Sequence, residues 1–376
     1  MLSLVSLFTD MASEMLYPVM PIFLKSIGFS VLFIGLLEGI AEAIAGLSKG
    51  YFGKLSDARG ERVPFVRWGY ALSAISKPLL AVSVFPLWIF LARTIDRLGK
   101  GIRTGARDAM LSAEATTETK ARIFGLHRAM DTAGAFVGPS LALLFLYFYP
   151  ERYQILFLVA FAPGVAAVFL TFLLKEKSQT KIESASVSLF SFVKYWKDSN
   201  PSYKKLVSGL LFFALINSSD VFLLLKLKES GLSDVQLIGA YIFYNLVYAL
   251  IAYPAGALAD RWGFKKTLLV GLLLFTLVYG GMSLNESGWW FGFLFLMYGI
   301  YSACTESIAK AWITNISRKK ETATAVGTYT AFQSICTLIA SAGAGLVWFS
   351  LGSTFLFFAT AILTGLVILY FLITKI

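Results

Sequence analysis

The stretch GKLSDARGER (Gly53–Arg62) recurs later in the same chain as GALADRWGFKK (Gly256–Lys266). Each copy follows an apolar stretch, and the segments before those stretches are also alike, GFSVLFIG in the first and GLSDVQLIG in the second. The chain therefore consists of two related halves. Four residues recur at a constant offset of 203 positions, so that Gly53, Leu55, Asp57 and Gly60 match Gly256, Leu258, Asp260 and Gly263.

The composition is that of a membrane protein. Hydrophobic residues make up 57% of the 376 positions and charged residues only 15%. Soluble domains average about a quarter charged residues, so a soluble enzyme is excluded and the surrounding solvent is a bilayer. At about 20 apolar residues for each crossing, the length suffices for roughly twelve spans and no extramembrane catalytic domain. We therefore expect a protein that is not an enzyme.

Twelve apolar stretches are long enough to cross a bilayer. They lie at residues 2–26, 31–52, 64–84, 86–106, 123–147, 153–174, 206–226, 235–257, 266–285, 289–312, 322–348 and 353–374. The predicted fold is an all-α integral membrane protein of two pseudo-symmetric six-helix bundles, at 1–175 and 206–376. A polar cytoplasmic linker is expected at 176–205, where SLFSFVKYW (Ser188–Trp196) has the pattern of a short amphipathic helix on the membrane surface.

The basic residues are distributed unequally between the two sides of the membrane. The formal net charge is +11, which in a soluble chain would suggest nucleic acid as a partner. When the loops alternate between the two sides, 19 Lys and Arg lie on one side and 4 on the other. Cytoplasmic loops collect Lys and Arg, so both termini are expected in the cytoplasm and nucleic acid is not an expected partner.

The repeated loop carries a family resemblance. The second copy, Gly-x-Leu-Ala-Asp-Arg-x-Gly-x-Lys-Lys, closely resembles the loop signature of the major facilitator superfamily, and the resemblance covers essentially the whole chain. It implies a secondary active transporter that works by alternating access and needs no cofactor. In the first copy Asp57 is followed by Ala58, and the arginine comes one place later than in the family pattern. The resemblance implies a conformational gate formed by Gly53, Asp57, Arg59, Arg62, Asp108, Gly256, Asp260 and Arg261.

The fifth span contains a second motif. The run from Gly134 through Gly138 to Pro139 resembles the Gly-xxx-Gly-Pro antiporter signature of exporters in this family. Glycines four residues apart let helices approach closely, and proline removes an internal hydrogen bond and permits a bend. The motif favours efflux by antiport, and the alternative is ordinary packing of small residues.

A third string, RTIDRLGKGIRTGARDA (Arg93–Ala109), lies in the fourth span and at its exit. Its Gly-Lys-Gly is not a phosphate loop, because neither Ser nor Thr follows the lysine and no strand precedes it. Together with EGIAEA (Glu38–Ala43) and GLHRAMDTAGAFVGP (Gly125–Pro139), the string resembles a bacterial exporter branch that includes nickel-resistance permeases. The resemblance places the protein in the bacterial inner membrane.

Acidic residues at membrane depth are the first candidates for chemistry, because each is costly unless it is paired or hydrated. Asp10 and Glu14 are spaced i, i+4 in the first span, and Glu38 and Glu42 repeat that spacing in the second. Such carboxylates can take up and release protons, hold a cationic solute, or bind a divalent metal through oxygen ligands. The alternative is that they pair with Lys77, Arg93 or Arg97, of which Arg97 is the preferred partner. No metal site is assigned; in a metal exporter these four acids would be the ligands.

Other spans add candidates for proton coupling or the substrate cavity. In the fifth span they are His127, Arg128 and Asp131, and the single histidine suits a proton relay better than a transition-metal site. In the second half, Asp220 ends a polar patch, Tyr244 lies on a tyrosine-rich face, and Glu306 has Lys310 one turn away as a possible ion-pair partner. The complete set is Asp10, Glu14, Glu38, Glu42, Arg97, Asp131, Asp220, Tyr244 and Glu306.

The sequence thus predicts a proton-coupled exporter of a small cationic or amphipathic solute, driven by the proton gradient. The expected partners are the solute, protons and membrane lipid, and the chain is expected to act as a monomer because it supplies both halves of a transport path. Three alternatives remain. They are export of a divalent metal such as nickel or iron, uptake of an anionic metabolite held by arginines, and a non-transporting membrane receptor or scaffold.

Overall fold

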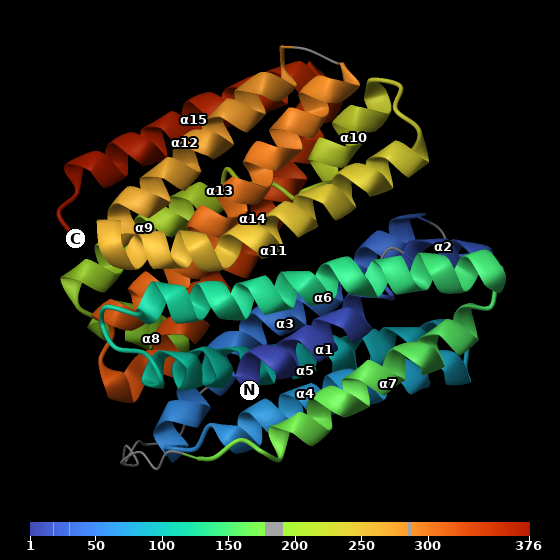
Figure 1. Ribbon diagram of the computed structural model, residues 1–376, viewed down its shortest axis with the longest axis horizontal. Coiled ribbons are helices and arrows are strands. Elements are labelled where there is room, and N and C mark those ends of the chain that lie inside the picture. Colours follow the sequence, from blue (N-terminus) through green and yellow to red (C-terminus); the bar gives the residue numbers. More distant parts are fainter. Residues whose placement is uncertain (18, 30, 177–190, 285–286) are drawn as a thin grey trace. The chain divides into compact units, whose positions relative to one another are not determined.

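The computed structural model describes residues 1–17, 19–29, 31–176, 191–284 and 287–376. Within them the chain is helical and has no strand, which confirms the all-α prediction (Figure 1). The elements are α1 (Leu2–Glu14), α2 (Met20–Ser26), α3 (Val31–Arg59), α4 (Val63–Val82), α5 (Pro86–Ala113), α6 (Lys120–Phe148), α7 (Tyr153–Thr171), α8 (Ser191–Asp198), α9 (Pro201–Ala214), α10 (Val221–Glu229), α11 (Asp234–Trp262), α12 (Phe264–Met282), α13 (Gly288–Ile316), the short 3₁₀ helix η1 (Lys319–Glu321), α14 (Thr322–Leu351) and α15 (Ser353–Ile373).

These helices account for the twelve expected spans, ten as single helices and two as pairs. Among the described residues, 7 helices are long and apolar enough to cross a membrane by length and composition alone. Of the other spans, two are divided, and α5 carries several charges, Arg93, Asp96, Arg97 and Lys100. Charged residues on a spanning helix must find partners within the protein or face water.

The first and seventh spans were expected to be continuous, and each is divided into two helices. α1 ends at Glu14 and α2 begins at Met20, where Pro21 in the first turn of the new helix has no amide hydrogen to extend the old one. α9 ends at Ala214 and α10 begins at Val221. There a run of short polar side chains competes for backbone groups, and the Ser219 amide donates to the Ser341 hydroxyl at 3.2 Å.

The structure forms two compact units, described here separately. Unit 1 contains Met1–Glu114, Met130–Asp198 and Ser317–Ala331, and unit 2 contains the rest of the chain. This division departs from the expected bundles at two places. Residues 115–129, at the start of α6, belong to unit 2, and residues 317–331, at the start of α14, belong to unit 1. The hydrogen bonds of Asp57 and Asp260, described below, each join one of these segments to the unit that contains it.

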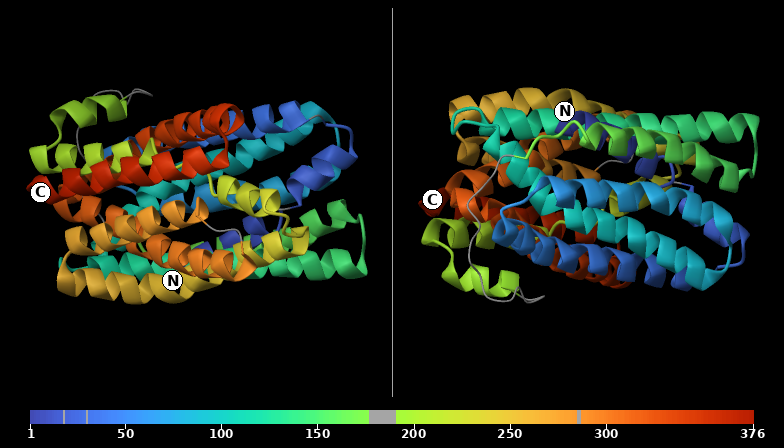
Figure 2. Two further views of the ribbon diagram at one scale, coloured as in Figure 1. Left: turned by 90° about the horizontal axis from the view of Figure 1, so that it is seen from above. Right: turned by 90° about the horizontal axis from the view of Figure 1, so that it is seen from below.

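Unit 1 is held together by close helix contacts. α4 lies beside both α5 and α7, and α5 also packs on α3 (Figures 1 and 2). At the contact of α4 with α5, a Cβ atom on Gly99 would lie 2.6 Å from the carbonyl oxygen of Gly69. Phe23 and Phe157 meet edge to face with ring centroids 5.0 Å apart in the apolar core.

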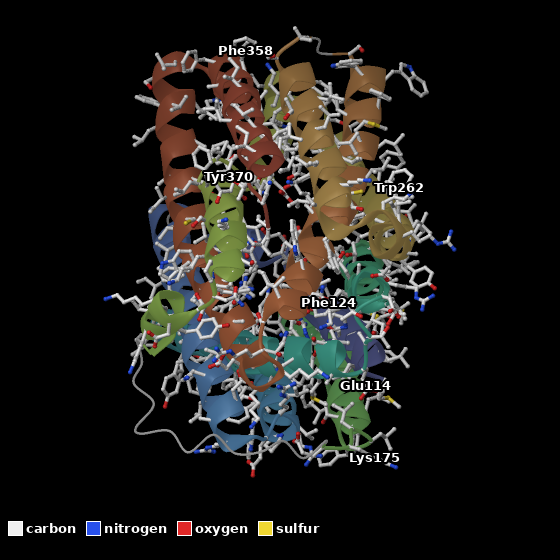
Figure 3. The ribbon with its side chains drawn as sticks, turned by 90° about the vertical axis from the view of Figure 1, so that its left-hand side faces the viewer. Glu114, Phe124, Lys175, Trp262, Phe358 and Tyr370 are labelled. Carbon is white, nitrogen blue, oxygen red and sulfur yellow. The ribbon has the colours of Figure 1, made fainter. Side chains whose placement is uncertain are left out.

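In unit 2, α13 packs on α11 and α12, and α12 also lies beside α15. The rings of Phe213 and Phe275 meet edge to face at 5.0 Å, and the ring of Tyr301 lies 4.9 Å from that of Phe275. Near the end of α15, the Tyr370 hydroxyl donates to the carbonyl oxygen of Lys205 at 2.8 Å, which ties α15 to α9 (Figure 3).

The expected amphipathic helix of the linker is observed as α8, which contacts α3. The part of the expected segment before residue 191 lies outside the described residues. Tyr195 is buried at 8% exposure, and burial, with a smaller contribution from the charge of Glu321, raises the pKa of its phenol to about 12. This tyrosine therefore stays neutral beside η1.

Substitution of Gly99 by valine tests the close contact of α4 and α5. Gly99→Val should destabilise the protein by about 1–3 kcal/mol, because the new side chain overlaps backbone atoms that cannot move independently. The melting temperature of the purified protein in detergent measures the effect. Gly365→Val is the matched control, since a Cβ at that helical glycine meets nothing within 4 Å. Equal melting temperatures for the two variants would contradict the close contact.

Candidate functional site

The aspartate of the first repeated loop binds the beginning of another helix. Asp57, at the end of α3, is 4% exposed. Its Oδ2 accepts from the Thr324 amide at 2.6 Å and from the Thr324 hydroxyl at 2.7 Å, and its Oδ1 accepts from the Ala323 amide at 3.4 Å. The first amides of α14 lack partners within the helix, so a carboxylate at this position satisfies them and complements the positive end of the helix dipole.

The aspartate of the second loop makes the equivalent contact. Asp260, near the end of α11, accepts from the Ala121 amide and the Arg122 amide, both at 2.9 Å, at the beginning of α6. In both copies, the glycine four positions before the aspartate permits the two helix backbones to lie this close together. A Cβ on Gly53 would lie 2.4 Å from the carbonyl oxygen of Ala323, and a Cβ on Gly256 equally close to that of Ala121.

The arginines of the expected gate lie in different surroundings. Arg62 is 4% exposed, and its guanidinium lies 3.5 Å from Asp57 Oδ1 and 3.5 Å from the Lys319 carbonyl oxygen. Arg59 is exposed and lies over the ring of Phe65 at 5.9 Å, and Arg261 is also exposed. The amides of Arg62 and Val63 donate to the Glu176 carboxylate at 3.0 and 2.7 Å. Sequence reasoning missed Glu176, which lies in a lysine-rich segment without a motif.

The remaining gate candidate, Asp108, lies within α5 and is fully buried. Its Oδ1 accepts from two nitrogens of Arg107, at 3.0 and 2.9 Å. Arg107 also donates to the Ser6 hydroxyl at 3.3 Å and lies 4.0 Å from Asp131 Oδ2. Asp108 therefore belongs to an ionic network between α1, α5 and α6, which the sequence did not predict because its members come from three distant segments.

Two expected proton-coupling residues meet in this network. Asp10 interacts electrostatically with Asp131, with the cations Lys100 and Arg103, and with Glu14. Asp131 is 5% exposed, whereas Asp10 is partly exposed. Two neighbouring carboxylates at membrane depth are a suitable place for a mobile proton, because protonation removes one of two like charges.

The glycine motif of α6 explains how these acids come together. A Cβ on Gly134 would lie 2.4 Å from the Leu7 carbonyl oxygen, and a Cβ on Gly138 would lie 2.5 Å from that of Met11. The Cβ atom of Asp10 is itself only 3.3 Å from the Cβ position of Gly134. α6 thus packs directly on the backbone of α1, and Asp131, one turn before Gly134, faces the same contact.

Lys77 and Arg93 belong to a separate cluster of charged side chains. Lys77 is 2% exposed, and its Nζ lies 2.7 Å from Asp96 Oδ1 and 3.0 Å from the Ser13 hydroxyl. Arg93 lies 3.9 Å from Asp96 Oδ2, and Arg97 interacts electrostatically with the same carboxylate. The cations considered as partners for the acids of the first two spans are thus arranged around Asp96.

Of the other acidic residues in the first two spans, the structure describes the side chain of Glu14 alone. Glu14 is partly exposed at the end of α1, where the first span divides. The side chains of Glu38 and Glu42 lie outside the described residues. Among the side chains that are described, His, Cys, Asp and Glu form no group of three or more that could hold a metal ion. The four-acid metal site remains a prediction.

Unit 2 contains a second polar cluster, with Asp220 at one end. Asp220 directly precedes α10, where the seventh span divides, and Tyr298 donates to its Oδ1 at 2.6 Å. The ring of Tyr244 lies 5.1 Å from that of Tyr298 and 6.1 Å from that of Tyr248. Tyr298 was not among the sequence candidates, although it shares a helix with Glu306, eight residues and about two turns away.

The other end of this cluster contains an ion pair. Arg128 on α6 lies 2.5 Å from Glu306 Oε2, and its Nε donates to the Tyr248 hydroxyl at 2.6 Å. The side chains of Arg128 and Glu306 are 34% and 45% exposed. An ion pair with Lys310 was the alternative role for Glu306, and Arg128, from another helix, is a partner that the sequence did not reveal.

The two divided spans hold corresponding positions in the two halves, since residue 15 plus the repeat offset of 203 is residue 218. Interrupted helices at equivalent places of a repeat mark the binding region in many transporters. Both breaks carry acidic residues, Glu14 in the first half and Asp220 in the second. The structure therefore brings most of the described candidates into two clusters, one in each unit.

Comparison with protein families supports this architecture. The family model described as Major Facilitator Superfamily matches residues 2–244 and, in a second match, residues 207–375. The chain belongs to the major facilitator superfamily. As a member of this family of membrane transporters, the protein is not an enzyme and needs no cofactor.

Three similar proteins cover most of the chain. An uncharacterised MFS-type transporter of Methanocaldococcus jannaschii is 32% identical over 98% of this chain and 94% of its own. A multi-drug resistance efflux pump homologue of Lactococcus lactis is 20% identical over 83% of this chain and 78% of its own. The crystal structure of the fucose:proton symporter of Escherichia coli superposes with a TM-score of 0.81 at 11% identity, covering 100% of this chain and 98% of that one.

Substitution of Asp57 tests the contact with α14. Asp57→Asn should loosen the beginning of α14, because the amide has no charge and one acceptor oxygen instead of two. Val326 is fully buried, and a cysteine placed there should react with a maleimide about threefold faster in the variant. The test uses a chain in which Cys304 and Cys336 are serine.

The control for this test is Glu61→Gln, which changes an exposed carboxylate of the same loop. The labelling rate of Val326→Cys should be unchanged in that variant. Equal rates in Asp57→Asn and Glu61→Gln would contradict a stabilising role for the Asp57 contact.

Proposed function

We propose that this transporter is a proton-coupled exporter of a small cationic or amphipathic solute that works by alternating access. The proposal places it in the bacterial inner membrane as a monomer. The excess of Lys and Arg on one side, 19 against 4, supports a cytoplasmic position for both termini.

The observation that carries the proposal is the acid pair of Asp10 and Asp131 at the glycine contact of α1 with α6. The two glycines that resemble an antiporter signature bring α6 onto the backbone of α1, close to Asp10. A proton bound here changes the charge of a network that also includes Arg107 and Ser6. Proton uptake at this site can therefore alter the packing of three helices at once.

The second cluster supports a cationic solute. Glu306 is nearly half exposed within a spanning helix, so it faces water or a ligand rather than lipid. Asp220 supplies a second carboxylate, and the intervening tyrosine rings supply faces that attract cations.

In the proposed cycle, protons from outside neutralise acids of the first half, with Asp10, Glu14, Glu38 and Glu42 as the candidates. Neutralisation weakens the binding of the cationic solute and drives its release. The contacts of Asp57 and Asp260 with helix beginnings close the cytoplasmic side in the outward-open state. Similarity to an efflux pump homologue supports export. The fucose:proton symporter has the same fold, so fold does not select the direction.

Proton flux in proteoliposomes that hold a pH-sensitive dye tests the proposal. Amphipathic organic cations, divalent metals and organic anions are added separately to one side. Proton movement with organic cations supports the proposal. Movement with Ni²⁺, Fe²⁺ or Co²⁺ alone would replace it with metal export, and movement with anions alone would replace it with anion symport.

Neutralising Asp10 should separate proton coupling from solute movement. In Asp10→Asn we expect proton movement to be abolished while solute exchange across the membrane continues, because the amide retains the shape of the side chain but cannot take up a proton. Dye fluorescence and exchange of a radiolabelled cation measure the two activities. Glu118→Gln, at an exposed carboxylate in the loop before α6, should keep both. Normal proton coupling in Asp10→Asn would exclude Asp10 from this role.

A further inference from the structure

Arg128 and Glu306 lie far from the ends of their helices. Arg128 is eight residues into α6, or about 12 Å along its axis. Glu306 is ten residues before the end of α13, or about 15 Å. Both side chains are nonetheless more than a third exposed. Charged groups at this depth that are not buried in protein must face an aqueous space, which is where a transported solute travels.

The guanidinium of Arg128 makes three kinds of contact at once. It pairs with Glu306 at 2.5 Å, donates to the Tyr248 hydroxyl at 2.6 Å, and lies 5.0 Å from the centre of the Tyr248 ring. A carboxylate, a hydroxyl acceptor and an aromatic face are the groups by which proteins recognise a guanidinium or an alkylammonium ion. The contacts of Arg128 therefore show that these groups can bind a guanidinium ion.

The same surroundings continue beyond Arg128. The ring of Tyr244 lies 6.1 Å from that of Tyr248 and 5.1 Å from that of Tyr298, whose hydroxyl binds Asp220. Tyr244 interacts electrostatically with both carboxylates, Asp220 and Glu306. A row of tyrosines therefore connects two acids, and the apolar part of a ligand whose cationic head lies at Glu306 would pack against these rings.

We propose that Arg128 occupies the binding position of a monovalent organic cation. A solute with a guanidinium or alkylammonium head binds between Glu306 and Tyr248 when Arg128 withdraws, and Arg128 returns when the solute leaves. This inference rests on the proposed function, since it identifies the head group of the cationic solute. The arginine acts as a competitor built into the chain, so the empty transporter leaves no unpaired carboxylate at membrane depth.

The position of Arg128 on α6 links this exchange to the proton site. Asp131 follows three residues later, so the two side chains lie about one helical turn apart on neighbouring parts of the helix surface. Residues of α6 up to Ala129 belong to unit 2 and residues from Met130 onward to unit 1. One continuous helix therefore carries both Arg128 and an acid of the proton site.

Equilibrium binding to the purified protein in lipid nanodiscs tests the inference, with benzylguanidinium and benzyltrimethylammonium as probes and neutral benzyl alcohol as the control ligand. Isothermal titration calorimetry measures affinity. We expect Arg128→Gln to bind at least one of the two cations about tenfold more tightly than the unmodified protein, because the competitor is removed. Glu306→Gln should bind that cation about tenfold more weakly than the unmodified protein.

Three further variants make the outcome specific. Arg152→Gln removes an exposed arginine between α6 and α7 and should leave affinity unchanged. Tyr248→Phe keeps the ring and should bind more tightly than Tyr248→Leu, which loses it. If Arg128→Gln does not fold, Arg128→Lys, which lacks the planar fork, should give a smaller increase in affinity.

Unchanged or weaker binding of both cations in Arg128→Gln would overturn the inference, as would equal effects of Arg128→Gln and Arg152→Gln. If proton flux with organic cations persists in such a case, the proposed function stands and only the binding position is wrong. If Arg128→Gln binds cations more tightly but no cation moves protons in proteoliposomes, the binding position stands and proton coupling is wrong.

Discussion

The structure depends on one interaction made twice, in which an aspartate carboxylate accepts hydrogen bonds from the first amides of a helix distant in sequence. Asp57 binds the beginning of α14, and Asp260 binds the beginning of α6. Each contact uses amides that a helix cannot satisfy itself, and each requires a glycine that allows two backbones to touch. Each unit therefore includes the beginning of a helix whose remainder belongs to the other unit. The repeated loop supplies the aspartate that binds this beginning.

A second constraint is the cost of charge at membrane depth, and the two units satisfy it differently. In unit 1 the ionic groups are mostly buried and linked to one another, with Lys77 on Asp96 and Arg107 on Asp108 and Asp131. In unit 2 the ion pair of Arg128 and Glu306 is more exposed and lies beside tyrosines. A buried ionic network responds to protonation by repacking, whereas an exposed ion pair can exchange partners. This contrast assigns the proton to the first unit and the solute to the second in our proposals.

The sequence predicted the helical fold well, because span length and loop charge are local properties. It did not predict that α1 ends at Glu14 or that α9 ends at Ala214, since the apolar pattern continues beyond the first and polar residues are tolerated beyond the second. Candidate residues were found because an ionisable side chain in an apolar span stands out. Their partners were not found, because pairs such as Arg128 with Glu306 join helices far apart in the chain.

The exchanged helix beginnings have a consequence for how the protein is made. Unit 1 contains residues 317–331, so it is incomplete until most of the chain has been synthesised. The amides that donate to the Asp57 carboxylate are translated 266 and 267 residues after Asp57 itself. The N-terminal bundle therefore lacks these hydrogen bonds until residues 323 and 324 have been synthesised. A chain truncated before residue 317 leaves unit 1 without its last helix segment.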